Sequence, residues 1–261
     1  MRRAGARLAA LLIALGPLIA PTASRGAVTQ SHGIRLAFSG SLRPRALPRS
    51  GSAPVSVSLS ARIAPADAGS LPQLRRIAIA INRYGRLDPR GLPRCRIDRI
   101  QPATSAEALA SCRGALVGRG TFSADVRVSE QAPFPSLGQV LAFNGRFHGR
   151  PAILAHIYGV DPAPTSDVLA FVVRHGRGSF GTVLEAKLPP ITGSWGYVTG
   201  ISLHLGRTFR RHGRRRSYLS AGCPAPPGIS IAPFTLARTA LAFAGGASLD
   251  STLSKTCRVA G

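Results

Sequence analysis

The stretch YVTGISLHL, residues 197–205, decides the fold class. Ile201, Leu203 and Leu205 fall on one face of an extended chain, whereas a serine and a histidine fall on the other. Apolar residues at every second position are typical of a strand with one buried face, because successive side chains of a strand point to opposite sides. We therefore expect a half-buried β-strand here.

Short alternating runs of the same kind recur along the chain, separated by Gly, Pro and charged residues. About a dozen such runs with turn signals roughly every 8 to 12 residues predict an all-β fold, either an antiparallel β-sandwich or a sandwich-like barrel. We expect one domain over residues 28–261, with the Pro-rich segment 129–138 as an alternative boundary between two smaller sandwiches. The runs that we interpret as strands are 34–39, 54–63, 74–82, 121–129, 139–147, 151–159, 168–175, 181–188, 197–205, 216–222, 235–244 and 248–259.

One short helix is expected at residues 105–111. Thr104 precedes it, and Glu107 follows three residues later. This spacing is that of a capping box, in which each side chain accepts a hydrogen bond from the backbone N–H of the other residue.

The N-terminus has the layout of a secretory signal peptide. Three arginines precede the 13-residue apolar run LAALLIALGPLIA (8–20), and small residues follow it. The run is shorter than the ~20 residues that a membrane-spanning helix needs. We therefore expect residues 1–27 to be removed on export, by cleavage after Ala23 or Ala27, and the protein to be secreted or associated with the bacterial cell envelope.

The chain is strongly basic. Loss of residues 1–27 would take four arginines from the formal net charge of +24 and leave +20. All but two of the 34 basic residues are arginines, a skew that is also typical of GC-rich coding sequences. The charge favours anionic partners but carries no information about the fold.

The four cysteines suit an oxidising compartment. Four cysteines allow three pairings, and proximity in the sequence favours Cys95 with Cys112 and Cys223 with Cys257. Zinc binding is disfavoured because the chain has no C-x-x-C motif and no histidine at ligand spacing from a cysteine. No metal site and no cofactor are expected.

The most concentrated charge lies in GRTFRRHGRRRSYLS, residues 206–220. The two-residue tip His212-Gly213 favours a tight hairpin. Arg211 would then face Arg214, and Arg210 would face Arg215. Opposed like charges repel, and a bound phosphate or carboxylate would relieve the repulsion. The candidate polyanion-binding residues are Arg207, Arg210, Arg211, Arg214, Arg215 and Arg216, with a purely hydrated hairpin tip as the alternative.

Two other patterns are weaker. The loop GRGSFG (176–181) matches the glycine spacing of dinucleotide-binding sites, but a strand rather than a helix follows, and no acidic residue lies near position 200. Trp195 and Tyr197 could form a sugar platform, but a loop tryptophan that caps the end of the core is the more ordinary interpretation. We therefore expect a glycine-rich hairpin and a packing aromatic pair.

A secreted hydrolase is the alternative class of function. His156, Tyr158 and Asp161 lie close together in the sequence, and a serine such as Ser217 or Ser220 would have to join them from another strand. A nucleophile, a base and an orienting group must converge in space, and nothing in the spacing shows that these do. No catalytic motif is present, so a non-catalytic protein is expected.

Five segments together resemble an uncharacterised family of exported, arginine-rich bacterial proteins. They are YGRLDPRGLPRC, ALVGRG, QAPFPSLGQVLAFNGR, GRPAILAHIYG and RRSYLSAGCPAP, and the resemblance covers most of residues 54–258. It implies export and the same four cysteines, and it carries no assigned activity, ligand or catalytic residue. The expected partners are anionic polymers or acidic surfaces of the cell envelope, not intracellular nucleic acid.

Overall fold

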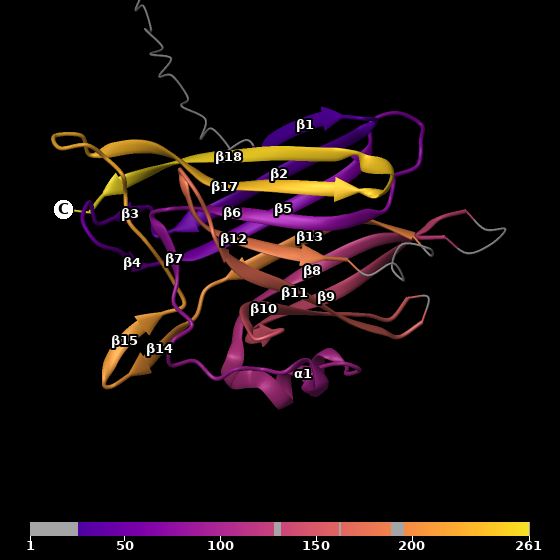
Figure 1. Ribbon diagram of the computed structural model, residues 1–261, viewed down its shortest axis with the longest axis horizontal. Coiled ribbons are helices and arrows are strands. Elements are labelled where there is room, and N and C mark those ends of the chain that lie inside the picture. Colours follow the sequence, from indigo (N-terminus) through magenta and orange to yellow (C-terminus); the bar gives the residue numbers. More distant parts are fainter. Residues whose placement is uncertain (1–25, 128–131, 162, 189–195, 261) are drawn as a thin grey trace, which may run out of the picture.

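The computed structural model describes residues 26–127, 132–161, 163–188 and 196–260, and in these residues β-strands predominate (Figure 1). The expected signal segment therefore lies almost wholly outside the described residues. One α-helix, α1 (Ser105–Cys112), and three short 3-10 helices at Ile97–Arg99, Arg113–Ala115 and Ala244–Gly246 accompany the strands. The strands are β1 (Ala27–Ser31), β2 (Ile34–Arg43), β3 (Ala46–Leu47), β4 (Ala53–Pro54), β5 (Ser56–Pro65), β6 (Leu74–Asn82), β7 (Gly85–Leu87), β8 (Leu116–Val126), β9 (Phe134–Phe147), β10 (Arg150–Gly159), β11 (Thr165–His175), β12 (Phe180–Lys187), β13 (Gly196–Leu205), β14 (Thr208–Arg211), β15 (Arg214–Ser217), β16 (Leu219–Ala221), β17 (Ile231–Phe243) and β18 (Ser248–Val259).

Thirteen of these strands form one large sheet, in the order β1-β2-β5-β13-β8-β9-β10-β11-β12-β6-β17-β18-β3. Every pairing in it is antiparallel except that of β18 with β3. The mainly-β class and the single short helix are confirmed. The sheet is mixed and continuous, so it is not clearly the antiparallel sandwich that the strand pattern predicted.

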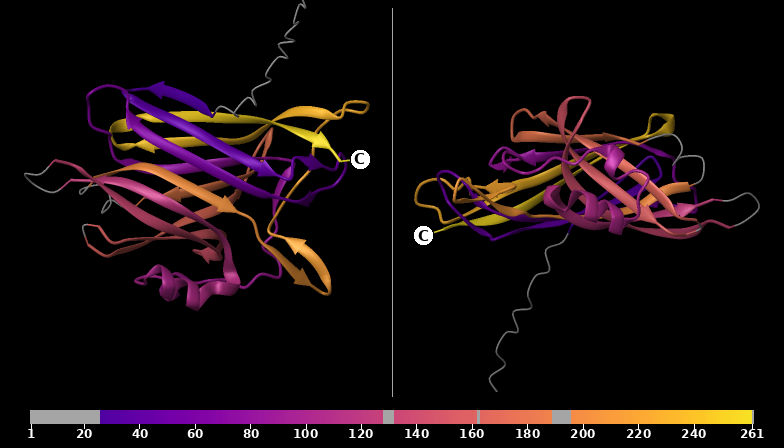
Figure 2. Two further views of the ribbon diagram at one scale, coloured as in Figure 1. Left: turned by 180° about the vertical axis from the view of Figure 1, so that it is seen from behind. Right: turned by 90° about the horizontal axis from the view of Figure 1, so that it is seen from below.

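The large sheet curls until its two ends approach each other, and β18 lies beside β1 and β2. Figure 1 and the left view of Figure 2 show the molecule from opposite sides: β17 and β18 are in front in Figure 1, and β2 and β5 are in front in the left view of Figure 2. Strand twist and local register shifts bend a sheet in this way. Such shifts occur in five of its pairings: β8 with β9, β8 with β13, β6 with β12, β6 with β17 and β17 with β18.

The main core lies between the two halves of the curled sheet. Along β2, Ile34, Leu36 and Phe38 are buried and alternate with exposed residues. Along β18, Leu249 and Leu253 are buried in the same way. Every second side chain of these strands therefore faces the interior, as the period-two sequence pattern requires.

A second, smaller core lies under α1 on the outer face of β9 and β10. Ile100 and Ala108 pack there against Phe143 and Leu154, and all four are fully buried. The predicted capping box starts the helix: the Thr104 side chain accepts from the Glu107 N–H, and the Glu107 carboxylate accepts from the Thr104 N–H at 2.8 Å.

Both disulfides form between the cysteines that sequence proximity favoured. Cys95 and Cys112 join the segment before α1 to the end of the helix, with Cα atoms 5.5 Å apart. Cys223 and Cys257 join the chain after β16 to β18, with Cα atoms 5.7 Å apart. None of the cysteines is free.

Candidate polyanion-binding site

The arginine-rich segment forms the predicted hairpin. β14 and β15 pair as a separate two-stranded sheet that projects from the body of the protein (Figure 1). His212 and Gly213 form the tip, with φ values of 50° and 73°. Arg211 faces Arg214, as the spacing predicted. The predicted register, and therefore the opposition of like charges, is confirmed.

The same two-residue turn occurs in two other hairpins. His32-Gly33 joins β1 to β2, and His148-Gly149 joins β9 to β10. These two histidines and His212 are the non-glycine residues with positive φ in the described part of the chain. A tight hairpin needs φ above zero at both central residues, and histidine tolerates that region better than β-branched residues do.

The hairpin side chains divide into an exposed tip and a buried root. Arg210, Arg211, Arg214, Arg215 and Arg216 are exposed, and Arg207 is half-buried. At the root, Ser217 is buried and its hydroxyl donates to the Arg207 carbonyl at 3.4 Å. Within the described ranges, the ion pairs of the protein use other arginines, so these guanidinium groups keep their donors for an external anion.

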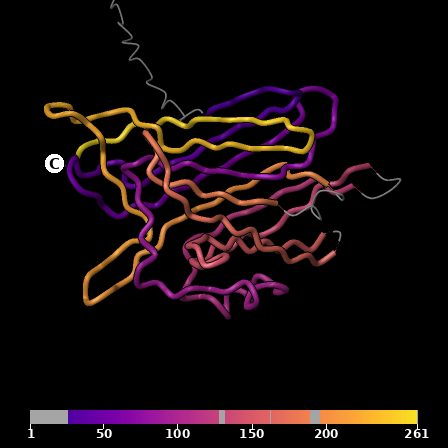
Figure 3. The backbone as a smooth tube through the Cα atoms, in the orientation of Figure 1, coloured from indigo at the N-terminus to yellow at the C-terminus, as the bar shows by residue number. Residues whose placement is uncertain are grey.

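A second basic stretch, residues 83–99, lies at the base of the hairpin. β7 pairs with β16, directly after the hairpin, and the Asp88 N–H donates to the Tyr218 carbonyl at 2.9 Å. Gly91 lies against Arg211, so closely that a Cβ on this glycine would be 2.7 Å from Cδ of the arginine. Figure 3 shows the backbone paths of the two segments where they come together. The two basic stretches, far apart in the sequence, form one surface.

Asp88 and Asp98 are the acidic residues of this surface, and Asp88 lies at the hairpin root. Burial opposes its ionisation, yet the Asp88 pKa lies below its usual value because Arg90 donates to it and Arg216 adds positive potential. The Arg90 Nε–H donates to the carboxylate at 2.9 Å. One carboxylate therefore partly neutralises the root of the hairpin, whereas the tip keeps its full charge.

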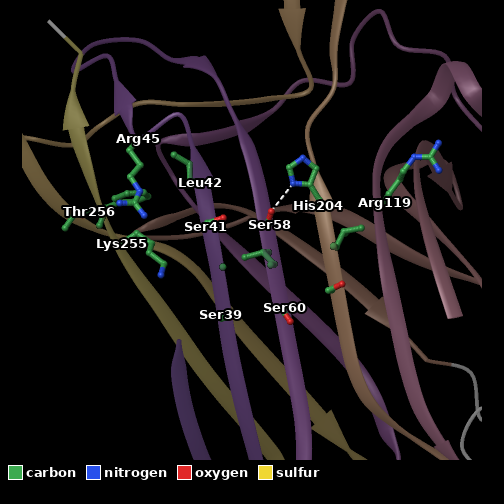
Figure 4. Close-up of a pocket in the computed structure, with 15 residues that line it drawn as sticks. Ser39, Ser41, Leu42, Arg45, Ser58, Ser60, Arg119, His204, Lys255 and Thr256 are labelled. Atoms are coloured by element: carbon green, nitrogen blue, oxygen red, sulfur yellow. Dashed lines mark hydrogen bonds between the residues drawn. The ribbon is translucent and has the colours of Figure 1, made fainter. Parts of the chain in front are cut away.

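A cleft of about 730 Å³ is lined by residues of β2, β5, β13 and β8 and reaches β18 (Figure 4). We call it the seam cleft. Its lining has no acidic residue among the described residues. Burial and the nearby Arg45 guanidinium both lower the Lys255 pKa, in that order of size. Its polar lining consists of Arg45, Arg119, His204 and Lys255 together with Ser39, Ser41, Ser58, Ser60, Ser202 and Thr256.

One end of the seam cleft adjoins the root of the hairpin. His204 is paired with Arg119 across the sheet, and its Nδ1 lies 2.9 Å from the Ser58 hydroxyl. β13 ends one residue later, and the hairpin begins at Thr208. This cleft could not be predicted from the sequence, because its basic side chains belong to separate segments of the chain and form no local sequence pattern.

The candidate hydrolytic residues do not form an accessible catalytic group. His156 is fully buried beneath the loop before α1. Its Nε2 lies 2.9 Å from the Ala103 carbonyl and 3.3 Å from the Ser166 hydroxyl. Burial lowers the His156 pKa, and the Ala103 hydrogen bond opposes this only in part. The histidine therefore holds a loop in place as a neutral group.

The other residues of that hypothesis lie elsewhere. Tyr158 is half-buried and Asp161 is exposed, while Ser217 belongs to the hairpin root and Ser220 pairs with Arg86 in the small sheet. None of these residues hydrogen-bonds to His156 among the described residues. The serines that sequence reasoning proposed are therefore not brought to this histidine.

The remaining candidate residues from the sequence either have structural roles or lie outside the described residues. GRGSFG makes the turn between β11 and β12, where the Gly176 N–H donates to the Gly181 carbonyl, and a strand follows as expected. Trp195 lies outside the described residues. The guanidinium carbon of Arg127 lies 5.2 Å from the centroid of the Tyr197 ring. The described ranges contain no cluster of metal-ligating side chains.

Comparison of the chain with protein-family models, with curated proteins and with solved structures gave no match. Of the helices in the described ranges, none has the length and hydrophobicity to cross a membrane. Any functional conclusion therefore depends on the geometry and charge of the surfaces described above.

Proposed function

We propose that this chain is an exported, non-catalytic binding protein whose arginine hairpin engages anionic polymers of the bacterial cell envelope. The observation that carries the proposal is the projecting β14–β15 ribbon, in which exposed arginines face each other in pairs. Like charges in directly opposed positions destabilise a ribbon, and a phosphate or carboxylate between two guanidinium groups converts the repulsion into attraction.

The surroundings of the hairpin favour an extended ligand. The seam cleft supplies further cations and hydroxyl donors next to the hairpin root, without an acidic lining residue. Its serine hydroxyls can donate to the same oxyanions that the guanidinium groups bind. A polymer with regularly spaced anionic groups would contact the hairpin tip and the cleft at once, and each contact would raise the affinity of the other.

Single-stranded nucleic acid fits the hairpin less well. Binding of unpaired bases uses exposed aromatic rings interleaved with the cations. Phe209 is half-buried and packs against the main core, and Tyr218 is 1% exposed. Neither ring is free to stack with a base, so the hairpin offers charge without a stacking platform.

Binding to poly(glycerol phosphate) and to heparin tests the proposal. The variant in which Arg211, Arg214, Arg215 and Arg216 are all replaced by Ser should lose at least tenfold in affinity at low salt. The matched control replaces four exposed arginines outside the hairpin, Arg35, Arg146, Arg150 and Arg177, and should lose much less. If the wild-type protein binds neither polymer, or if both variants lose affinity equally, the proposal is wrong.

A further inference from the structure

The interior of the curled sheet contains an unfilled apolar space. A cavity of about 100 Å³, which we call the inner cavity, is lined by inward-facing side chains of strands from both halves of the sheet. Its lining side chains are apolar except Ser60 and Thr239. Leu59, Ile79 and Phe122 face this interior yet are only half-buried. Protein interiors are normally close-packed, so these apolar side chains lack the partners that a closed core would give them.

The lining of the inner cavity extends along the strands. On β13 its lining runs from Val198 to Leu205, a span of about 23 Å at strand geometry. On β6 it runs from Leu74 to Ile81. A lining that extends along the strands suits an alkyl chain.

A second, wider cleft of about 390 Å³, which we call the end cleft, adjoins this space. Phe122, Leu169, Leu188 and Val198 line both the end cleft and the inner cavity, so the two are neighbours along one apolar wall. Leu137, at the edge of the end cleft, is 69% exposed. An apolar ligand would thus meet apolar surface from the solvent to the interior.

Acidic residues are prominent in the polar lining of the end cleft, which also includes Ser136, Thr165 and Tyr197. Asp125, Asp161 and Asp167 are among its lining residues, a concentration of acidic groups in a protein with only ten. The Asp167 carboxylate accepts from the Gln101 side-chain amide at 3.3 Å. Carboxylates accept hydrogen bonds from hydroxyl groups and repel anions. The end cleft therefore favours a head group that donates hydrogen bonds and is not anionic.

We propose that the curled sheet binds one single-chain amphiphile, with its alkyl chain in the inner cavity and a hydroxyl head group in the end cleft. Apolar cavities in proteins stay dry and take up apolar ligands, and burial of each methylene favours binding. This site uses the inner face of the sheet and shares no function with the arginine hairpin. The two proposals can therefore succeed or fail separately.

Displacement of the uncharged fluorescent probe N-phenyl-1-naphthylamine by octanol, dodecanol and hexadecanol measures this binding. The affinity should rise by about fourfold for each added methylene until the chain fills the cavity. Dodecanoate should bind more weakly than dodecanol, because its carboxylate meets the acidic lining. No displacement by any alcohol, or tighter binding of dodecanoate than of dodecanol, would overturn the assignment.

Two phenylalanine substitutions on one strand locate the ligand. Ala61 on β5 lines the inner cavity, whereas Ala64 on the same strand is exposed. Ala61→Phe should weaken dodecanol binding at least tenfold and octanol binding less than threefold. The reason is that the phenylalanine side chain would obstruct only the inner part of the inner cavity. Ala64→Phe should leave both unchanged. Thermal melting identifies any variant that fails to fold, and Ala61→Leu then replaces Ala61→Phe as the obstructing variant. Equal effects at positions 61 and 64 would contradict the proposal.

Discussion

Arg211 lies directly opposite Arg214 in the β14–β15 ribbon, one residue from the tip on each side. Two exposed guanidinium groups are thereby held across a hairpin without an acidic partner among the described residues. This pairing costs stability, and an anion bound between the two groups would recover it. A polyanion should therefore stabilise the hairpin as well as bind to it.

The three His-Gly turns make a prediction about stability. Replacement of His148 by Val should lower the free energy of unfolding by about 1–2 kcal/mol, because a β-branched residue strains at positive φ. Replacement by Asn should be nearly neutral, since Asn adopts this region readily. Chemical denaturation of the two variants measures the difference. Equal stabilities would show that the turn does not impose its backbone geometry.

The buried histidine makes the fold sensitive to acid. The folded-state pKa of His156 lies below its unfolded value near 6.5, so the unfolded chain binds the proton more tightly. The stabilisation is complete above pH 6.5 and is lost as the pH falls toward the folded-state pKa. Between pH 7.5 and 5.5 the free energy of unfolding of the wild-type protein should fall more steeply than that of His156→Gln. The excess slope is at most about 1.4 kcal/mol per pH unit. Parallel curves for the two proteins would contradict this role for His156.

The two disulfides should differ in their contribution to stability. Cys223 and Cys257 close a loop of 34 residues, and Cys95 and Cys112 close one of 17. The loop-entropy relation predicts losses of about 4 and about 3 kcal/mol when each pair is replaced by Ala. Urea unfolding of the two double variants measures the order. Titration of the folded wild-type protein should find no reactive thiol.

Local features were predictable from the sequence because their causes are local. The capping box of α1 and the register of the arginine hairpin each depend on residues only a few positions apart. The preference for nearby cysteines was likewise correct for both disulfides.

The curl of the sheet and its clefts were not predictable in the same way. Arg45, Arg119 and Lys255 reach the seam cleft from distant parts of the chain. The inner cavity exists because two sheet halves meet with incomplete packing, and alternation within one strand does not encode that fit. The meeting of the two basic stretches at Gly91 and Arg211 likewise arises only from the pairing of β7 with β16.

The salt dependence of polymer binding tests the central claim most directly. The variant Arg211→Ser with Arg214→Ser and the variant Arg146→Ser with Arg150→Ser each remove two exposed arginines near a His-Gly turn. The slope of log affinity for poly(glycerol phosphate) against log salt counts the counterions that binding releases. We expect the hairpin variant to lower that slope by about 1–2 and the control variant to leave it unchanged. Equal changes in the two variants would show that binding follows net charge and that the hairpin is not a site.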